Sequence, residues 1–482
     1  MSSVSSSWTS TGLFVLFCVI NFLNFLDRGI IPGAPTQFQY FIQTTRNVST
    51  SQEGFYLGLL TSSFVASYAV FVLLFGYLSI FIQPFRLVAI GLFVWCLAVL
   101  LCGLAKEAES FSLLLVGRLL SGIGESSFQC IAPAFIDDNA PANTQSFWLG
   151  VFYACSSVGL AFGVQYGAVM ANSPWGWSWA FYLEAIVVFP LACICLWAVP
   201  DAYNRRPSTA PPELKAKDGS QLERRTFWAE VCSVCHNAIF FLIIWGAGAS
   251  VFSLSGLSTF GTLFLVGLGV FPNDIEASLV LGCIVVASGI LGTPLGGLAL
   301  DWEAANHPPS RRQFIALRQL VFLSLLVVVF ALLSWAALPI KFWFLFLYTW
   351  TLVLFSASTA ATITALLLCV HPSRRALATG VYALLVHVFG DVPAPIIIGA
   401  LKDAWAPHCN SLVVNQNVVL NPECATKDYD GLLMTMLCPL LWMIWSALSY
   451  GGAFILSRRH VIYHPDAENI QDDGHDSKTS TI

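Results

Sequence analysis

Charged residues are scarce in this sequence, and their scarcity excludes a water-soluble globular domain. Lys, Arg, Asp and Glu make up 10% of the 482 residues, against about 25% in a typical soluble domain. Hydrophobic residues make up 57%, and the mean hydropathy is +0.73. The net charge is only -5 and the basic residues are scattered, so a nucleic acid is not an expected partner. The composition indicates a polytopic membrane protein.

The sequence also lacks the motifs of ATP-driven or hydrolytic chemistry. It contains no P-loop, nucleophile elbow or metalloprotease signature. Its cysteines lie mostly in apolar runs, and the pair Cys232 and Cys235 has no second pair to complete a four-ligand zinc site. We therefore expect no catalytic residue, no metal and no cofactor, and the protein is not expected to be an enzyme.

Apolar runs long enough to cross a bilayer fall into two series of six. The first series covers about residues 12–34, 55–82, 86–105, 110–137, 145–171 and 177–199. The second covers about residues 237–268, 276–300, 314–338, 342–370, 375–401 and 431–456. Two six-helix halves joined by a linker are the layout of major facilitator carriers. The sequence thus predicts an all-α membrane protein with the major facilitator fold and 12 transmembrane helices.

The composition between and after these runs predicts the domain boundaries. Residues 1–199 should form the N-terminal half, 200–235 a polar cytosolic linker, 236–457 the C-terminal half and 458–482 a disordered cytosolic tail. With both termini in the cytosol, most basic residues fall on the cytosolic side, as the positive-inside rule requires. The basic residues on the other side are then only Arg46, Lys106, Lys341, Lys402 and Lys427.

Two features of the non-cytosolic loops follow from this orientation. Asn47-Val48-Ser49 is a glycosylation sequon in the first such loop, so Asn47 is a candidate for glycosylation, with a chance tripeptide as the alternative. Cys409 and Cys424 lie in the polar segment 403–430, outside the cytosol, where disulfides persist. We expect these two cysteines to be paired.

Charged residues inside apolar runs are the strongest functional signal. Asp27 and Arg28 lie in the first run, where a charge near the bilayer centre costs about 2.5 to 3.5 kcal/mol and is usually functional. Arg118 and Glu125 lie seven residues apart in the fourth run, hence on nearly the same helix face. Glu125 and Asp27 are candidates for proton coupling, and Arg28 and Arg118 for substrate binding or ion pairs. The alternative is a permanent ion pair that braces the bundle. Glu184 is a further acid within an apolar run.

His387 and Asp391 lie four residues apart in the eleventh run and should share a helix face. Pro393 and Pro395 follow them and leave backbone carbonyls that need other partners or water, which favours a cavity. The pair is a candidate for substrate binding or an ion pair, although a membrane histidine is often only a helix-to-helix hydrogen-bond donor.

The chain resembles the Spinster family of major facilitator transporters. The likeness covers about the whole membrane core and rests on Asn24-Phe25-Leu26-Asp27-Arg28, on Gly117-Arg118 with Gly124-Glu125-Ser126-Ser127 and Ile131-Ala132-Pro133, and on His387, Gly390-Asp391, Pro395 and Gly399. The resemblance implies transport of lysophospholipids or sphingoid lipids such as sphingosine-1-phosphate, in several members from late endosomes or lysosomes. It also implies proton coupling through the acids that match Asp27 and Glu125.

The chain departs from the family pattern in the loop after the second run. Such carriers usually read Gly-Tyr-Leu-Gly-Asp-Arg there, whereas this chain reads Gly76-Tyr77-Leu78-Ser79-Ile80-Phe81. The counterpart after the eighth run keeps its acid, Asp301, which is the candidate gate residue. The cytosolic gate should therefore be asymmetric.

The leading hypothesis is a proton-linked symporter of a lysophospholipid or sphingoid lipid, which works by alternating access. The alternatives are a carrier of a small organic anion and a non-transporting membrane sensor or scaffold. Expected partners are a lipid or amphipathic small molecule, protons and the membrane, and the chain is expected to be a monomer. The expected location is a lysosomal, endosomal or plasma membrane.

Overall fold

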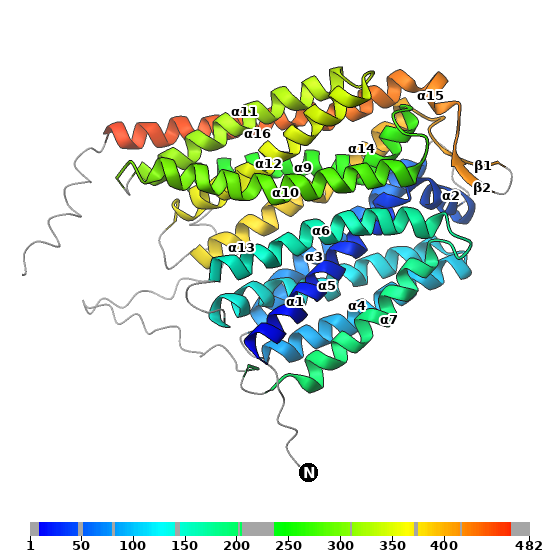
Figure 1. Ribbon diagram of the computed structural model, residues 1–482, viewed down its shortest axis with the longest axis horizontal. Coiled ribbons are helices and arrows are strands. Elements are labelled where there is room, and N and C mark those ends of the chain that lie inside the picture. Colours follow the sequence, from blue (N-terminus) through cyan, green and yellow to red (C-terminus); the bar gives the residue numbers. More distant parts are fainter. Residues whose placement is uncertain are drawn as a thin grey trace, which may run out of the picture.

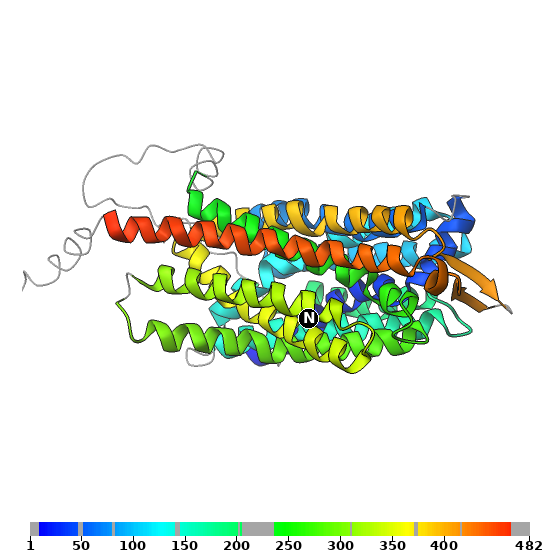
Figure 2. The ribbon, with the colours of Figure 1, turned by 90° about the horizontal axis from the view of Figure 1, so that it is seen from above.

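The computed structural model is a bundle of long helices in two halves (Figures 1 and 2). It describes residues 9–46, 52–79, 82–139, 145–200, 203–204, 236–308, 311–370, 375–414 and 417–463. In Figure 1 the helices α1 to α7 form one half and α9 to α16 the other, and the β-hairpin lies at one end of the molecule. We call this the hairpin end. The opposite end, where α1 begins and α16 ends, is the linker end.

The N-terminal half contains seven α-helices and one π-helical turn among the described residues. They are α1 (Ser10–Gly33), α2 (Pro35–Arg46), α3 (Glu53–Leu78), α4 (Pro84–Glu107), α5 (Phe111–Asn139), α6 (Gln145–Ala171), α7 (Ser178–Cys193) and η2 (Ile194–Ala198). The C-terminal half begins with α9 (Ala238–Gly267), α10 (Asp274–Ala304), α11 (Arg312–Ala336) and α12 (Lys341–Leu367). It continues with α13 (Arg375–Val386), η5 (His387–Asp391), α14 (Pro393–Trp405), β1 (Ser411–Val414), β2 (Asn417–Leu420), α15 (Cys424–Lys427) and α16 (Tyr429–Tyr463).

The long helices match the expected spans. Within the described residues, 11 helical segments are long and apolar enough to cross a membrane. The charged side chains of Arg118 and Glu125 interrupt the apolar face of α5, the remaining long helix of the N-terminal half. Counted with α5, the bundle has the twelve spans of the predicted fold.

Polar caps fix where several helices begin. The Thr9 hydroxyl accepts a hydrogen bond from the Gly12 N–H at the start of α1, and the Asn237 side chain accepts from Ile239 N–H at 3.0 Å at the start of α9. The Asn273 side chain accepts from Glu276 N–H at 2.9 Å at the start of α10. These side chains satisfy backbone donors that have no partner inside the helix.

Glycines bring α1 and α6 into backbone contact. A Cβ atom added at Gly159, Gly163 or Gly167 of α6 would overlap the carbonyl oxygens of Phe22, Leu26 and Ile30 of α1. Small residues at four-residue spacing allow this close approach between membrane helices. The packing fixes α1, and thus its charged residues, against the rest of the half.

Two elements near the hairpin end are not among the expected spans. The helix α2 follows directly on α1, after a break at Ala34 and with Pro35 at its first position. The strands β1 and β2 pair antiparallel, with Ser411 opposite Leu420. The sequon residue Asn47 and most of the linker 200–235 lie outside the described residues.

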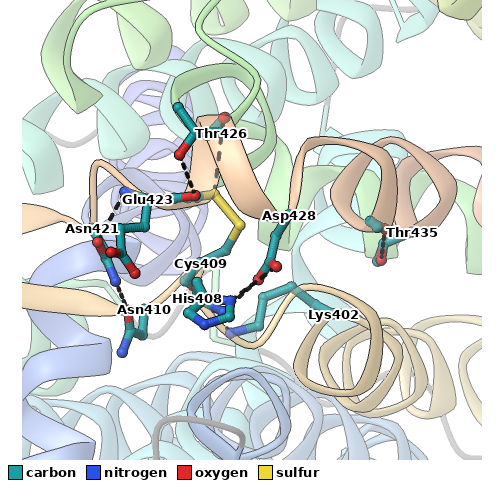
Figure 3. Close-up of a disulfide and its surroundings, with 12 residues drawn as sticks. Lys402, His408, Cys409, Asn410, Asn421, Glu423, Thr426, Asp428 and Thr435 are labelled. Carbon is teal, nitrogen blue, oxygen red and sulfur yellow. Dashed lines mark hydrogen bonds and ion pairs between the residues drawn. A yellow bond between two sulfur atoms is a disulfide. The ribbon is translucent and has the colours of Figure 1, made fainter.

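A disulfide closes the loop that carries this hairpin (Figure 3). The sulfur atoms of Cys409 and Cys424 are 2.01 Å apart, and both residues are buried. The His408 backbone N–H donates to the Asp428 carboxylate at 2.5 Å, and Nδ1 of His408 lies 3.0 Å from the same carboxylate. The hairpin is therefore joined at its base to the start of α16.

Candidate functional site

Two ion pairs in the N-terminal half form the core of the candidate site. Nη1 of Arg118 donates to both carboxylate oxygens of Asp27, at 2.9 and 2.7 Å. Nε of Arg28 donates to Oε2 of Glu125 at 3.1 Å. Adjacent residues of α1 thus pair with two residues of α5 that lie two turns apart. The Asp27 and Glu125 side chains are fully buried, whereas that of Arg28 is 21% exposed.

Aromatic rings of α3 cover both guanidinium groups. The guanidinium carbons of Arg118 and Arg28 lie 4.6 and 5.0 Å from the centroid of the Phe64 ring. That of Arg28 also lies 4.8 Å from the centroid of Tyr68. Guanidinium groups are attracted to aromatic faces, and the attraction is stronger where water is excluded. The rings therefore stabilise both cations inside the bundle.

Tyr68 also connects this cluster to the C-terminal half. Its ring meets the His387 ring edge to face, with centroids 5.6 Å apart. Nδ1 of His387 lies 2.5 Å from Oδ2 of Asp391, and both side chains are about three-quarters buried. The two residues occupy η5, where the Val392 N–H donates to the His387 carbonyl at 3.0 Å. Such π-helical turns often occur at functional sites.

The structure therefore gathers six of the predicted residues into one region that crosses both halves. The region runs from Asp27, Arg118, Arg28 and Glu125 through Tyr68 to His387 and Asp391. We call this group of seven residues the polar belt. It combines two guanidinium groups, three carboxyl groups, an imidazole and a phenol, and can bind an anionic group or hold protons.

Several polar atoms around the belt have no hydrogen-bond partner within the described residues. They include Nδ2 and Oδ1 of Asn24, Nη2 of Arg28, Nε of Arg118 and Oε1 of Glu125. By contrast, Asn21 is fully satisfied, because it donates to the Phe152 carbonyl and to Ser156 and accepts from Gln129. Buried polar groups normally have partners. The belt is therefore surrounded by buried polar atoms that no described side chain or backbone group satisfies.

A second buried charged cluster joins the two halves at the hairpin end. The Asp403 carboxylate of α14 accepts hydrogen bonds from the N–H groups of Gly54 and Phe55 in the first turn of α3, at 2.9 and 2.8 Å. Nζ of Lys402 lies 2.7 Å from Asp403 and donates to the Cys409 carbonyl at 3.2 Å. A carboxylate from one half thus caps a helix of the other half.

Glycines allow this close approach between the halves. A Cβ atom at Gly58 of α3 would overlap the Pro395 carbonyl, and one at Gly399 of α14 would overlap the Gly54 carbonyl. The Ser411 N–H donates to the buried Glu53 carboxylate at 3.4 Å, which ties the hairpin to the same contact. The helices α3 and α14 therefore pack directly against each other at the hairpin end.

The geometry can be compared with known proteins. The Major Facilitator Superfamily model matches residues 17–395. The probable sphingolipid transporter spinster homolog 2 of Arabidopsis thaliana is 31% identical over 416 residues, which cover 82% of this chain and 82% of the plant protein. Protein spinster homolog 1 of Homo sapiens is 28% identical over 410 residues, 81% of this chain and 74% of the human protein. The chain belongs to the Spinster family of the major facilitator superfamily.

Solved structures agree with the fold of this Spinster-family chain. A bacterial homolog of the human lysosomal transporter Spinster, in an inward-facing and unoccupied conformation, superposes with a TM-score of 0.71 at 20% identity. The match covers 95% of this chain and 98% of the bacterial chain. The predicted family and fold are confirmed, and the protein is a membrane transporter and not an enzyme.

The predicted gate residue of the Spinster-family chain lies at the linker end and is exposed. Asp301 forms an ion pair with Arg312 at 2.9 Å, with side chains 67% and 50% exposed. Two residues further along α10, Glu303 pairs with Arg318. Ile80 and Phe81, where the family usually has its acid and arginine, lie outside the described residues. Among the described residues, the ion pair of Asp301 is with Arg312 and not with a residue of the polar belt.

Sequence reasoning missed several residues of the two clusters. Phe64 and Tyr68 lie in an apolar run whose composition gives no sign that one face covers two cations. Lys402 was expected only as a loop cation, and Asp403 and Glu53 were not singled out. The adjacent opposite charges Lys402 and Asp403, at the end of an apolar run, are the one local signal that was present.

Proposed function

We propose that this chain is a proton-coupled carrier of a lysophospholipid or sphingoid lipid that works by alternating access. The proposal rests on two ion pairs inside the membrane bundle, Asp27 with Arg118 and Arg28 with Glu125. Buried ion pairs contribute little net stability, because removing two charges from water offsets their attraction. A pair of this kind has a functional use if its acid exchanges a proton during transport.

Proton exchange at Glu125 would release Arg28. Glu125 is fully buried, whereas the Arg28 side chain is 21% exposed, so we assign the contact with a substrate to Arg28. When Glu125 gains a proton, Arg28 loses its counter-charge and becomes free to bind an anionic headgroup. Loss of the proton restores the ion pair and releases the headgroup.

Neutralising Glu125 tests the coupling. Glu125→Gln should leave folding near normal and remove the pH dependence of transport, because the amide mimics the protonated acid at every pH. Wild-type transport should fall as the pH rises and Glu125 returns to its pair with Arg28, whereas the variant should stay at the acidic limit. The measurement is uptake of a labelled lysolipid into proteoliposomes across a pH series.

Two further variants complete this experiment. Asp27→Asn should behave like Glu125→Gln if the two acids act in one relay. Glu276→Gln, at an exposed acid in the first turn of α10, should keep the wild-type pH profile. A Glu125→Gln protein with the full wild-type pH response would refute the proposed role of Glu125.

The lipid substrate is supported by the relatives and by apolar surface beside the belt. The plant relatives of this chain carry the name of probable sphingolipid transporters. Next to His387, the side chains of Val388 and Phe389 remain 45% and 38% exposed. Trp245 of α9 packs against Phe389 with ring centroids 5.3 Å apart. A charged headgroup at the belt would thus have apolar side chains alongside for its tail.

A carrier of a small organic anion is the second candidate. Nη2 of Arg28 and Nε of Arg118 are buried donors without a partner in the described part of the chain, and such donors suit a carboxylate or phosphate. Side-by-side uptake of lysolipids and organic anions in proteoliposomes separates the two carriers. Uptake of neither would favour the non-transporting sensor or scaffold.

Alternating access requires that the contact at the hairpin end opens. Asp403 holds the first turn of α3 there, so we propose that its two hydrogen bonds break in each transport cycle. Asp403→Ala removes both acceptors. Hydrogen bonds to charged groups contribute about 1.5 to 3 kcal/mol, so amide exchange at Gly54 and Phe55 should accelerate on the order of tenfold to a hundredfold. Hydrogen–deuterium exchange of residues 52–58 measures this.

Matched variants separate the cap from general loosening of this end. Asp403→Asn keeps one acceptor oxygen and should give an intermediate exchange rate. Asp430→Ala, at an exposed acid at the same end, should leave the rate unchanged. Unchanged exchange in Asp403→Ala would mean that the contact between the halves does not depend on this carboxylate.

We further propose cytosolic termini, a monomeric carrier and a lysosomal, endosomal or plasma membrane location. The disulfide of Cys409 and Cys424 supports this orientation, because disulfides persist outside the cytosol. Asn47 would then be available for glycosylation on the same side.

A further inference from the structure

The Glu184 side chain of α7 is a buried acid that neither ion pair uses. The residue is only 3% exposed, and neither of its carboxylate oxygens has a hydrogen-bond partner in the part of the chain that the structure describes. An ionised carboxylate in such surroundings is very unfavourable, so a buried acid without a counter-charge retains its proton. The surroundings of Glu184 therefore favour the neutral, protonated acid.

The titratable groups that interact electrostatically with Glu184 come from four other helices. They are Asp27 of α1, Cys96 and Cys102 of α4, Arg118 and Glu125 of α5, and Tyr166 of α6. Asp27 and Glu125 already form ion pairs with the two guanidinium groups of this region, those of Arg118 and Arg28. Three carboxyl groups thus share two cations, and Glu184 is the one without a partner.

Arg118 has an N–H group that could donate a hydrogen bond to Glu184. Its Nη1 contacts both oxygens of Asp27, while its Nε is buried without a partner among the described residues. Both Arg118 and Glu184 lie about two turns from the hairpin end of their helices, roughly 10 Å by the helical rise. Arg118 and Glu184 thus lie at a similar depth in the bundle, and the two groups interact electrostatically.

We propose that Glu184 is a third proton-carrying residue of the transporter. Glu184 holds a proton while Asp27 is paired with Arg118, and it exchanges this proton with Asp27. This inference rests on the proposed proton coupling and adds a residue to it. In the exchange, the O–H bond at Glu184 breaks and an O–H bond forms at Asp27. Arg118 then leaves the neutral Asp27 and pairs with the new Glu184 carboxylate. The number of protons and the net charge of the cluster stay constant, so the exchange needs no further reactant.

Infrared spectroscopy tests the stored proton directly, without a substrate. A protonated carboxyl group has a carbonyl stretch distinct from that of a carboxylate. The difference between the infrared spectra of the wild type and Glu184→Gln should therefore show one protonated carboxyl band at neutral pH. Glu184→Gln keeps the size of the side chain and should fold normally. Glu276→Gln, which alters an exposed acid, should show no such difference. A Glu184→Gln spectrum identical to wild type in this region would overturn the proposal.

The pH profile of transport tests whether the proton is carried as well as stored. If Glu184 exchanges protons with Asp27, Glu184→Gln should flatten the pH dependence of uptake while its thermal unfolding stays close to wild type. Loss of the infrared band with an unchanged pH profile would show that Glu184 is a structural acid only, and the proposal fails. If wild-type uptake has no pH dependence at all, the proposed coupling fails, whereas the infrared band still reports whether Glu184 holds a proton.

Discussion

Replacing Arg118 by Met is expected to destabilise the protein by about 3 to 5 kcal/mol, because the change leaves the Asp27 carboxylate buried without a counter-charge. The Asp27 side chain is fully buried and that of Arg118 is 3% exposed, so water cannot take over the role of the guanidinium. Both Asp27 oxygens accept from Nη1 of Arg118. The free energy of unfolding in detergent micelles, from a denaturant titration, measures the loss.

The double variant Asp27→Leu with Arg118→Met is the matched control. It removes both charges and leaves apolar side chains of similar length, so most of the lost stability should return. The coupling energy of the double-mutant cycle should then be several kcal/mol. The single Asp27→Leu variant completes the cycle, and transport should be absent in all three variants. A single Arg118→Met variant within about 1 kcal/mol of wild type would contradict the buried, mutually dependent pair.

This outcome would separate the structural and functional roles of the pair. If a folded double variant with two apolar residues does not transport, the charges are retained for activity and not for stability. Glu125→Gln addresses the same question at the neighbouring pair without removing the cation. The two experiments together distinguish a permanent brace of the bundle from a working proton site.

The membrane spans could be predicted from the sequence, because the thickness of the bilayer sets their length. The run expected at 86–105 is α4, Pro84–Glu107, and the run expected at 342–370 is α12, Lys341–Leu367. Apolar composition determines such helices locally. The strands β1 and β2 could not be predicted in this way, because each has four residues and the disulfide and the neighbouring helices hold them.

The candidate site could be predicted only in part. Helical periodicity places Arg118 and Glu125 on one face, but it does not say which residue of α1 each one meets. That choice depends on how α1 crosses α5, and α1 is fixed by its glycine contacts with α6. The cap of α3 by Asp403 joins residues 349 positions apart, so no local pattern could indicate it.

Binding across a series of acyl chain lengths should show a steep loss of affinity as the chain is shortened. Transfer of one methylene from water to apolar surroundings contributes about 0.8 kcal/mol. Removal of four carbons should therefore weaken binding by roughly 3 kcal/mol, on the order of a hundredfold in Kd. The prediction follows if the tail lies along apolar side chains such as Val388 and Phe389 while the headgroup meets Arg28 and Arg118. Affinity must be referred to the aqueous monomer concentration, with purified protein and ligands below their micelle concentration.

The arginine variants show whether binding occurs at the polar belt or on the apolar surface of the protein. Arg28→Ala should weaken all members of the series by about the same factor, because it removes a headgroup contact and leaves the tail contacts in place. A fatty alcohol of matched chain length has the tail without the charged headgroup, so it should compete poorly with the lysolipid for the wild type.

A small organic anion gains nothing from a longer chain, so a flat series combined with sensitivity to Arg28→Ala would identify the anion carrier and exclude the lipid. Affinity that rises with chain length but ignores Arg28→Ala would show only adsorption to the membrane-facing surface. The lipid carrier therefore requires dependence on both the tail and the arginine, because only a bound amphiphile places its headgroup at the polar belt and its tail along the apolar side chains beside it.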